Sequence, residues 1–313
     1  MESIYWVLSR DCNQQCAHCY NNSMPGAPGL TYTEVDRCVA HLPNPNDVPV
    51  GRFILSGGEP LVWPELLFHT LSKLYARYHD ASALWLQTNG DYLDEKMLER
   101  LLAHHVTRVD VSGMDNYHRH GDSDRRDTLE SMFKAHGMRP VSEAVVFNEK
   151  DDVHPRAPLY HFWGCTPETW IGPIWPRGRA WRHGLSKAGP KDRFCAMWSG
   201  GLNFLNYRER YSEINLQIED VYPCCPMTIA PIGSLLDAPL IDILDQCAQH
   251  PVFQSLNEGN PEDMGTSFGV SEVYGRERSD ALGNHCLWCD EFFQQHAPSL
   301  LYKQGRTTRG NIT

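Results

Sequence analysis

Residues 12–19 read Cys12-Asn-Gln-Gln-Cys16-Ala-His-Cys19, three cysteines in one short segment that follows the apolar run Ile4-Tyr-Trp-Val-Leu8. The apolar run predicts a buried strand, so the cysteines belong to the loop that leaves it. Three thiolates on one loop can ligate three irons of a four-iron cluster and leave the fourth iron without a protein ligand. A redox-active thiol pair would account for Cys16 and Cys19 but not for Cys12. The segment therefore predicts an iron–sulfur site with one open iron.

Short apolar runs alternate with amphipathic helical patterns through the first part of the chain. Thr31 and Glu34 match a capping box, Pro64 suits the first position of a helix, and Asp94 suits an N-cap. This alternation predicts an α/β fold with a parallel sheet, whose functional loops lie at the carboxyl ends of the strands. The expected strands are residues 4–8, 52–56, 83–87, 107–112, 141–147 and 169–174.

The pattern then changes, which divides the chain into two predicted domains, residues 1–185 and 186–313. In the second domain, two alternating runs at 202–207 and 212–218 flank a polar turn and predict a β-hairpin. Residues 257–285 show little periodicity. A loop of this length is usually functional or mobile, so we expect this segment either to cover the substrate pocket or to decorate the surface.

Polar and glycine-rich motifs follow the expected strands. Gly57-Gly-Glu-Pro60 follows the second strand, Thr88-Asn89 the third, Ser112 the fourth, and Pro176-Arg-Gly-Arg-Ala180 the sixth. Each motif taken alone is a common strand-ending turn. Glycines also let the backbone approach a ligand closely, and a partly desolvated carboxylate such as Glu59 can pair with a cationic amine. All of these motifs share one edge of the predicted sheet.

Four further cysteines in the C-terminal part suit a second metal site. They are Cys195, one of the adjacent pair Cys224 and Cys225, and the CxxC pair Cys286 and Cys289. Four thiolates fit a structural zinc site and an iron–sulfur cluster equally in ligand number, so spacing alone leaves both metals open. Cys38 differs, because it lies on the apolar face of an expected helix and is expected in the core.

Taken in order, the CxxxCxxC loop, the GGEP motif, the polar strand ends and the PxGRA element resemble the radical S-adenosylmethionine (SAM) superfamily over residues 4–180. The resemblance implies a partial (β/α)6 TIM-like barrel with a [4Fe-4S] cluster on Cys12, Cys16 and Cys19, and SAM on the open iron. It implies that the SAM ammonium group is held by Gly57, Gly58 and Glu59. The other SAM contacts that it implies are His18 at the adenine edge, Thr88, Asn89 and Ser112 at strand ends, and Pro176, Gly178 and Arg179 along the adenine and ribose.

By the same resemblance, residues 186–313 look like a twitch domain, a shortened SPASM domain, which implies a small α+β unit containing the β-hairpin. Such a domain holds one auxiliary [4Fe-4S] cluster. The ligands that the resemblance implies are Cys195, Cys224, Cys286 and Cys289, with Cys225 as the alternative to Cys224. A structural zinc site with four cysteines stays open as the other interpretation.

The resemblance implies a radical SAM oxidoreductase, in which a 5′-deoxyadenosyl radical abstracts hydrogen from the substrate. Similar twitch enzymes include dehydrogenases and epimerases, so we expect oxidation or epimerisation of a small polar, sugar- or aminocyclitol-like substrate. Modification of a precursor peptide is the alternative, and a zinc- or iron-binding interaction module is a further one. The candidate catalytic residues are Arg177, His118 and Glu143 for substrate contact or proton transfer, and Cys165 or the unligated cysteine of 224–225 for hydrogen return.

Composition narrows the partners. The 313 residues carry a net charge of −11. Nucleic-acid binding requires a positively charged surface, so this charge argues against a nucleic-acid partner. No apolar run approaches the roughly 18 residues of a membrane span. Eleven cysteines without a secretory leader suit metal ligation better than disulfides. We therefore expect a cytoplasmic monomer or dimer that acts on a small molecule and receives electrons from a donor such as flavodoxin or ferredoxin.

Overall fold

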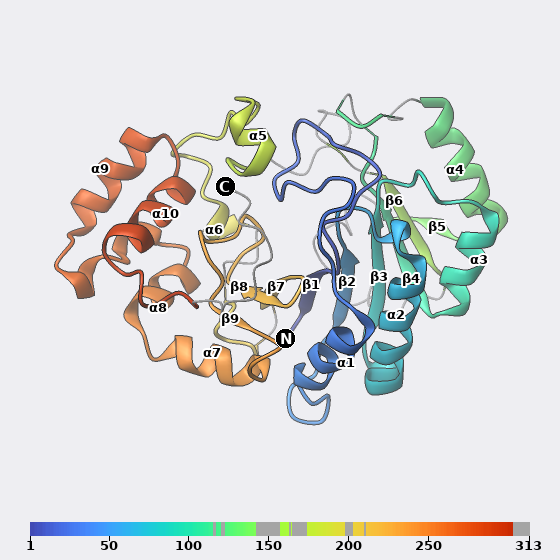
Figure 1. Cartoon of the computed structure of the whole chain (residues 1–313), viewed down its shortest axis with the longest axis horizontal. Helices are drawn as coiled ribbons and strands as arrows, with labels where there is room; N and C mark the ends of the chain where they lie inside the picture. Colours follow the sequence, from blue (N-terminus) through green and yellow to red (C-terminus); the bar gives the residue numbers. More distant parts are fainter. Residues whose placement is uncertain are drawn as a thin grey trace.

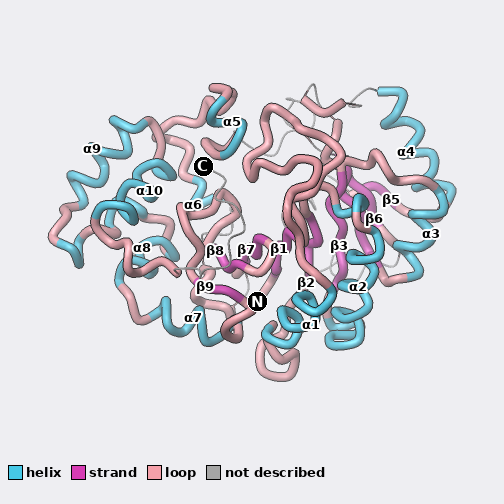
Figure 2. The backbone as a smooth tube through the Cα atoms, viewed as in Figure 1, coloured by secondary structure: helices cyan, strands magenta, loops and turns pink. Residues whose placement is uncertain are grey.

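The computed structural model describes residues 1–114, 117–119, 123–141, 157–162, 164, 174–197, 203–209 and 211–302. In this part of the chain one sheet has the strand order β5-β6-β4-β3-β2-β1-β7-β8-β9. Its strands are β1 (Ser3–Val7), β2 (Arg52–Ser56), β3 (Ala83–Thr88), β4 (Val106–Val111), β5 (Arg139–Pro140), β6 (Leu159–Phe162), β7 (Glu213–Gln217), β8 (Asp220–Tyr222) and β9 (Gly233–Ser234). The helices are α1 (Tyr32–His41), α2 (Pro64–Tyr78), α3 (Glu95–Ala103), α4 (Ser123–Ala135), α5 (Gly178–Arg182), α6 (Phe194–Met197), α7 (Leu240–Ala248), α8 (Pro251–Asn257), α9 (Glu272–Leu282) and α10 (His285–Gln295). Figures 1 and 2 show α1–α4 gathered around β1–β6, and α7–α10 beyond the opposite end of the sheet.

The sheet is parallel from β5 to β7. β1 pairs in parallel with β2 on one side and with β7 on the other, and the parallel pairing continues through β3, β4 and β6. This mixed α/β architecture with a parallel sheet confirms the predicted fold class, a partial TIM-like barrel. Since parallel strands share one carboxyl edge, the loops that follow β1, β2, β3 and β4 meet at that edge.

Local sequence signals determine the first helices as predicted. The Thr31 side chain accepts from the Glu34 backbone and the Glu34 carboxylate accepts from the Thr31 backbone, which completes the capping box of α1. Pro64 opens α2, and the Asp94 side chain caps α3 by accepting from Met97. Cys38 on α1 is fully buried, which confirms its place in the core.

The two faces of the parallel strands differ in chemistry. One face carries Ile4, Trp6, Phe53, Leu55 and Leu86, which are fully buried and form one apolar core with the helices. Burial of each such side chain stabilises the fold by about 1.5–3 kcal/mol, so this face determines where the helices pack. Because successive strand residues alternate between faces, the residues between them point to the opposite side.

That opposite side, here called the inner face, is largely polar. Its upper layer, towards the carboxyl edge of the strands, contains Ser56, Gln87, Asp110, His161 and Gln217, whose register follows from the strand pairing. An all-parallel sheet usually reads as continuous hydrophobic runs because both faces are buried in apolar surroundings. A polar inner face therefore indicates a function other than packing.

The predicted hairpin at 202–207 and 212–218 is wrong in its first strand. Residues 203–209 form turns, and the backbone N–H of Leu205 donates to the Asn257 side chain. The hairpin in the structure instead joins β7 and β8, which pair antiparallel. β7 also pairs with β1, so this C-terminal segment extends the parallel sheet. The boundary between residues 185 and 186 stays a prediction.

Residues 257–285 contain regular structure, contrary to the expected irregular loop. They form the 3-10 turns η4 (Pro261–Asp263) and η5 (Thr266–Phe268) and the helix α9, which packs on α10 and η4. A Cβ atom on Gly275 would lie 2.4 Å from the carbonyl oxygen of Glu262. α9 therefore packs through close backbone approach and small side chains, which explains why its apolar periodicity is weak.

Two expected strands cannot be compared fully, because residues 142–147 and 169–173 lie outside the described part of the chain. The sequence did not predict β6, a run of only four residues that directly follows Pro158. Within the described residues, no helix combines the length and apolar character needed to cross a membrane.

Candidate functional site

The CxxxCxxC motif lies on residues 9–29, here called the cysteine loop, at the carboxyl end of β1. The Leu30 N–H donates to the Leu8 carbonyl at 3.1 Å, which joins the two ends of the loop. Further along, the Cys12 N–H donates to the Met24 carbonyl at 3.3 Å. These bonds return the loop to its origin, so the three cysteines are held on a closed segment.

The three thiols lie close enough to interact. The Cys12 thiol is affected electrostatically by those of Cys16 and Cys19, and its burial raises its pKa to about 12. The Gln14 side-chain carbonyl accepts from the Cys16 thiol at 3.3 Å, and that of Asn21 from the Cys19 thiol at 3.1 Å. Desolvated thiolates are costly unless a cation compensates them. The three donors therefore fit an iron–sulfur cluster by their chemistry.

The glycines of the GGEP motif bring this segment against the cysteine loop. A Cβ atom on Gly58 would lie 2.3 Å from the Asp11 carbonyl oxygen, and one on Gly57 would lie 2.8 Å from that of Ser9. The N–H groups of Gly58 and Glu59 donate to these same carbonyls, at 2.7 and 2.9 Å. The absence of side chains at these two positions is therefore required for the loop to dock.

The Glu59 carboxylate is almost fully buried and accepts three hydrogen bonds. They come from the Thr88 hydroxyl at 2.7 Å, the Asn89 N–H at 2.7 Å and the Leu61 N–H at 3.0 Å. Desolvation raises the pKa of Glu59 to about 7, although the three hydrogen bonds oppose the rise. Ser112 completes the group, because its N–H donates to the Thr88 carbonyl at 2.8 Å. The GGEP motif and the ends of β3 and β4 thus meet in one network.

A second network ties the cysteine loop to the segment after β3. The side chains of Asn13 and Gln14 each donate to one Asp91 carboxylate oxygen at 2.6 Å. The Asn89 amide donates to the Asn13 carbonyl oxygen at 2.9 Å, and Arg125 forms an ion pair with Asp91 at 2.8 Å. The sequence did not single out Asp91, whose role depends on the approach of two loops that are distant in the chain.

The PxGRA element docks on the other side of the cysteine loop. Gly178 has a φ of +55°, and a Cβ atom there would lie 2.2 Å from the Tyr20 carbonyl oxygen. The Arg179 guanidinium donates to the carbonyls of Cys16 at 2.9 Å and Ser23 at 2.6 Å. Its Nη1 atom is buried without a hydrogen-bond partner among the described residues. This donor could bind an acceptor on a ligand next to the loop, which fits SAM.

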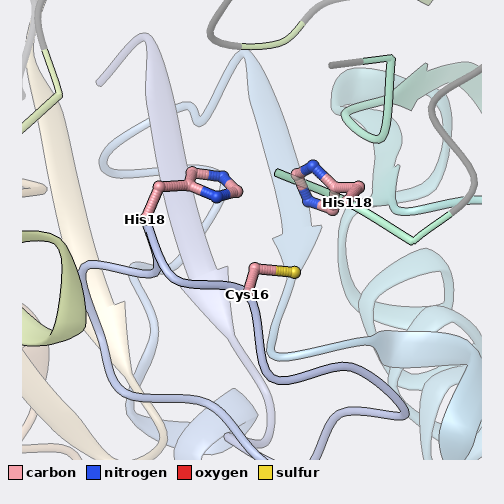
Figure 3. A group of neighbouring side chains, drawn as sticks. All are labelled: Cys16, His18 and His118. Carbon is pink, nitrogen blue, oxygen red and sulfur yellow. The ribbon is translucent and has the colours of Figure 1, made fainter. Parts of the chain in front are cut away.

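Aromatic side chains surround the middle of the motif. The His18 ring lies 5.0 Å from the Tyr117 ring and 4.7 Å from the His118 ring, measured between centroids. Figure 3 shows the two imidazole rings side by side next to the Cys16 sulfur, and they meet edge-on at 69°. The donor atoms of the three residues lie within 4.8 Å of one another. The structure thus places the candidate residue His118 beside the cysteine loop. Glu143 and Cys165 lie outside the described residues.

The second set of cysteines gathers around one small pocket, here called the four-thiol pocket, with Arg177 in its wall. Burial raises the pKa of all four thiols, and each interacts electrostatically with at least one of the others. Four buried sulfur donors around one space fit a tetrathiolate metal site. The cysteines that line the pocket are Cys195, Cys224, Cys286 and Cys289.

Cys225 points away from this pocket although it directly follows Cys224. Its thiol accepts from the Asn215 amide at 3.3 Å and donates to the Glu213 carboxylate at 3.6 Å. Both partners are inner-face residues of β7, and the Tyr5 hydroxyl of β1 is also within electrostatic reach. The thiols of Cys224 and Cys225 therefore lie in two different environments.

The inner face provides polar groups that the sequence analysis did not select. The Tyr5 hydroxyl lies 2.8 Å from the Ser56 hydroxyl and 2.7 Å from the Gln87 side-chain oxygen. Arg108 and Asp110 form a buried ion pair at 2.7 Å. A signal for Asp110 was present in the sequence, because polar and apolar residues alternate from Arg108 to Ser112.

Buried atoms of the inner face that lack hydrogen-bond partners among the described residues include the Trp85 indole nitrogen and the Gln217 side-chain oxygen, on side chains that are 5% and 1% exposed. His161 is also on this face, on β6, with its Nδ1 atom 4.0 Å from Asp110, and burial lowers its pKa. Buried polar groups are normally hydrogen bonded, so the unpartnered donor and acceptor mark this face as one that a polar ligand would complete.

Known proteins resemble this chain in sequence profile and in fold. Residues 6–152 match the sequence profile of the radical SAM superfamily. The structure of BtrN in complex with AdoMet and 2-DOIA has a similar fold, with a TM-score of 0.52 at 14% identity over 87% of this chain and 93% of that one. SuiB of Streptococcus suis bound to S-adenosylmethionine has a TM-score of 0.44 at 11% identity, over 82% of this chain and 67% of that one. No curated protein matches the sequence.

Proposed function

We propose that this protein oxidises or epimerises a small polar substrate. The proposal starts from the radical SAM domain, because enzymes with this domain bind a [4Fe-4S] cluster and SAM. When bound, these cofactors supply the radical chemistry that removes a hydrogen atom from the substrate. The protein has three tasks: to hold the cofactors, to orient the substrate, and to move protons or electrons afterwards.

The cysteine loop and its neighbours hold the cofactors in this proposal. Cys12, Cys16 and Cys19 ligate the cluster, and Arg179 orients the loop through its two carbonyl contacts. Glu59 fixes the GGEP segment by accepting hydrogen bonds from the end of β3. In the proposal, the same carboxylate also pairs with the SAM ammonium group. The further proposed contacts to SAM are His18, Gly57, Gly58, Thr88, Asn89, Ser112, Pro176 and Gly178.

The polar inner face is the observation that carries the proposed substrate class. Tyr5, Ser56 and Gln87 form one hydrogen-bonded group, and the unpartnered atoms of Trp85 and Gln217 offer a donor and an acceptor. Leaving such buried groups unsatisfied costs about 1–3 kcal/mol each. Hydroxyl and amino groups of a sugar- or aminocyclitol-like molecule would satisfy both kinds of atom.

The four-thiol pocket would hold an auxiliary [4Fe-4S] cluster. Its four sulfur donors satisfy every coordination position of such a cluster, which suits electron acceptance more than substrate binding. Cys224 is the proposed ligand of the adjacent pair, since the Cys225 thiol bonds to Asn215 and Glu213 instead. A zinc ion in the same pocket would be unable to accept an electron.

Oxidation and epimerisation require different residues after hydrogen abstraction. Oxidation needs a base that takes a proton from the substrate, for which His118 and Glu143 are the proposed candidates. Epimerisation needs a thiol that returns a hydrogen atom, for which Cys165 and Cys225 are the candidates. Cys225 adjoins the inner face through Asn215. Arg177 was also a candidate for substrate contact, but its donors bind carbonyls of the chain and Asp290.

The test is anaerobic reconstitution of the protein with iron and sulfide, followed by reduction with dithionite in the presence of SAM and a panel of aminocyclitols and amino sugars. A productive substrate should raise the yield of 5′-deoxyadenosine and give a new product. In heavy water, deuterium should enter an epimerised product and be absent from an oxidised one. Turnover of a precursor peptide with no response to the small molecules would overturn the proposed substrate class.

A further inference from the structure

Arg177 connects the four-thiol pocket to the rest of the molecule through several bonds at once. Its guanidinium donates to the Pro226 carbonyl at 2.9 Å and the Met227 carbonyl at 3.0 Å, in the segment that follows Cys224. It also donates to the Cys286 carbonyl at 3.2 Å, at the start of α10. One side chain thus joins the two segments that carry three of the four thiols.

The Arg177 guanidinium also places a positive charge beside those thiols. It lines the four-thiol pocket, and its pKa is raised by electrostatic interaction with Asp290, Cys286, Cys289 and Cys224, against the effect of burial. Only 11% of its side chain is exposed. Because water screens little at such a position, the field of this charge at the sulfur atoms is stronger than that of a surface arginine.

Asp290 is the counter-ion of this arginine. Its carboxylate lies 3.0 Å from the Arg177 guanidinium. In the sequence, Asp290 directly follows the ligand candidate Cys289. The carboxylate acts on the thiols of Cys286 and Cys289 with the opposite sign to the guanidinium. The pocket therefore has the Arg177 guanidinium in its wall, ion-paired with the Asp290 carboxylate.

The backbone of the next residues fixes this arrangement from the other side. Gly178 and Arg179 dock on the cysteine loop, where the Arg179 N–H donates to the Cys19 carbonyl at 2.9 Å. Arg177 is thereby held between the two cysteine sites. Its position relative to the four thiols does not depend on a mobile side chain, since both ends of the connection are hydrogen bonded.

We propose that Arg177 is a positioning residue that raises the reduction potential of the cluster in the four-thiol pocket, and that Asp290 offsets part of this effect. The inference rests on the proposed iron–sulfur identity of that site. One-electron reduction of such a cluster adds one negative charge, which a neighbouring cation stabilises and a neighbouring anion destabilises. The pair thereby adjusts how readily the site accepts an electron from a substrate radical.

The experiment is a mediated redox titration of the reconstituted protein with dithionite, followed by electron paramagnetic resonance. SAM alters the signal of the cluster with the open iron, so the signal that SAM leaves unchanged is assigned to the four-thiol pocket. Asp290→Asn should shift its midpoint potential to more positive values. Arg177→Met should shift it to more negative values. Arg182→Met, an exposed arginine one turn later on α5, is the matched control and should leave it unchanged.

A double variant isolates the arginine charge. In Asp290→Asn protein the Arg177 guanidinium has lost its ion-pair partner. Adding Arg177→Met to this protein should give a negative shift relative to Asp290→Asn alone. A merely structural role predicts loss of iron or the same shift in both single variants. Shifts of equal sign, or no shift in Asp290→Asn protein that retains its iron, would overturn the inference.

The result also separates this inference from the proposed function beneath it. If the four-thiol pocket holds zinc, the protein will contain about four irons and no second signal, which overturns both the auxiliary cluster and the role of Arg177. If about eight irons and two signals are present but the opposite shifts are absent, the auxiliary cluster stands and the inference on Arg177 and Asp290 fails.

Discussion

The Arg179 guanidinium lies 2.9 Å from the Cys16 carbonyl oxygen, although 163 residues separate the two in the chain. A second bond to the Ser23 carbonyl at 2.6 Å fixes the same side chain on the same loop. The turn at residues 176–180 is therefore part of the support of the cysteine loop, and the shape of the loop depends on it.

Replacing Arg179 with Met should weaken SAM binding at least tenfold. The variant loses two charge-assisted hydrogen bonds, and a hydrogen bond of this kind contributes about 1.5–3 kcal/mol, while 1.4 kcal/mol corresponds to a tenfold change in affinity. Equilibrium dialysis with labelled SAM on the reconstituted protein measures the effect. Arg182→Met is the control, because Arg182 is exposed and donates its hydrogen bond to the Asn22 side chain, without the carbonyl contacts of Arg179. Equal affinities for the two variants would contradict the supporting role.

Replacing Gly58 with Ala should prevent normal docking of the GGEP motif. The new Cβ atom would lie 2.3 Å from the Asp11 carbonyl oxygen, a backbone atom that cannot rotate away. We expect a loss of about 1–3 kcal/mol in the free energy of unfolding, together with a lower iron content. Gly189→Ala is the matched control, since the nearest atom to its Cβ would be 3.9 Å away. Urea unfolding and iron analysis of both variants give the comparison.

Replacing Glu59 with Gln should destabilise the network at the end of β3. One carboxylate oxygen accepts a hydrogen bond from the Asn89 N–H, and the other accepts from the Thr88 hydroxyl and the Leu61 N–H. In a glutamine, the amide NH2 would replace one of these oxygens and would face a backbone N–H donor without an acceptor. An unsatisfied buried donor costs about 1–3 kcal/mol. Glu65→Gln, at an exposed position paired with Arg100, should change the unfolding midpoint much less, because water screens a surface ion pair. Similar unfolding midpoints for the two variants would argue against the network.

The same carboxylate predicts a pH dependence of stability. Desolvation raises the pKa of Glu59 to about 7 in the folded protein, against about 4.3 in an unfolded chain. Between these values the folded state binds more protons than the unfolded state, so stability should fall as the pH rises through this window. Glu59→Gln should lack this component. The check is the difference in unfolding free energy between the two proteins at pH 5 and pH 8, which should be larger at the lower pH.

Replacing Cys224 and Cys225 in turn should affect iron content differently. Cys224→Ser removes a thiol of the four-thiol pocket and should reduce iron from about eight to about four per chain. Cys225→Ser should keep its iron, because this thiol bonds to Asn215 and Glu213 instead. Iron analysis after anaerobic reconstitution tests this, with Cys38→Ser as a core control. The reverse pattern would assign the ligand to Cys225.

Local spacing predicted much of the molecule because it reports short-range chemistry. The capping box at Thr31, the N-cap at Asp94 and the core position of Cys38 depend on residues within a few positions of each other, and all three are confirmed. The failures were long-range in origin. Residues 203–209 form turns held by Asn257, and α9 packs through Gly275, so neither segment shows its environment in its own pattern.

The sequence by itself determined the kind of chemistry, since three cysteines on one loop and four beyond it restrict the possible metals by donor type and number. Only the tertiary structure decided which groups act together. It turned Cys224 toward the four-thiol pocket and Cys225 toward β7, placed Arg177 in the wall of that pocket, and aligned Tyr5, Ser56 and Gln87 across three strands. The physical reason is that strand register and loop docking are set by burial of the whole apolar face, which no single segment encodes.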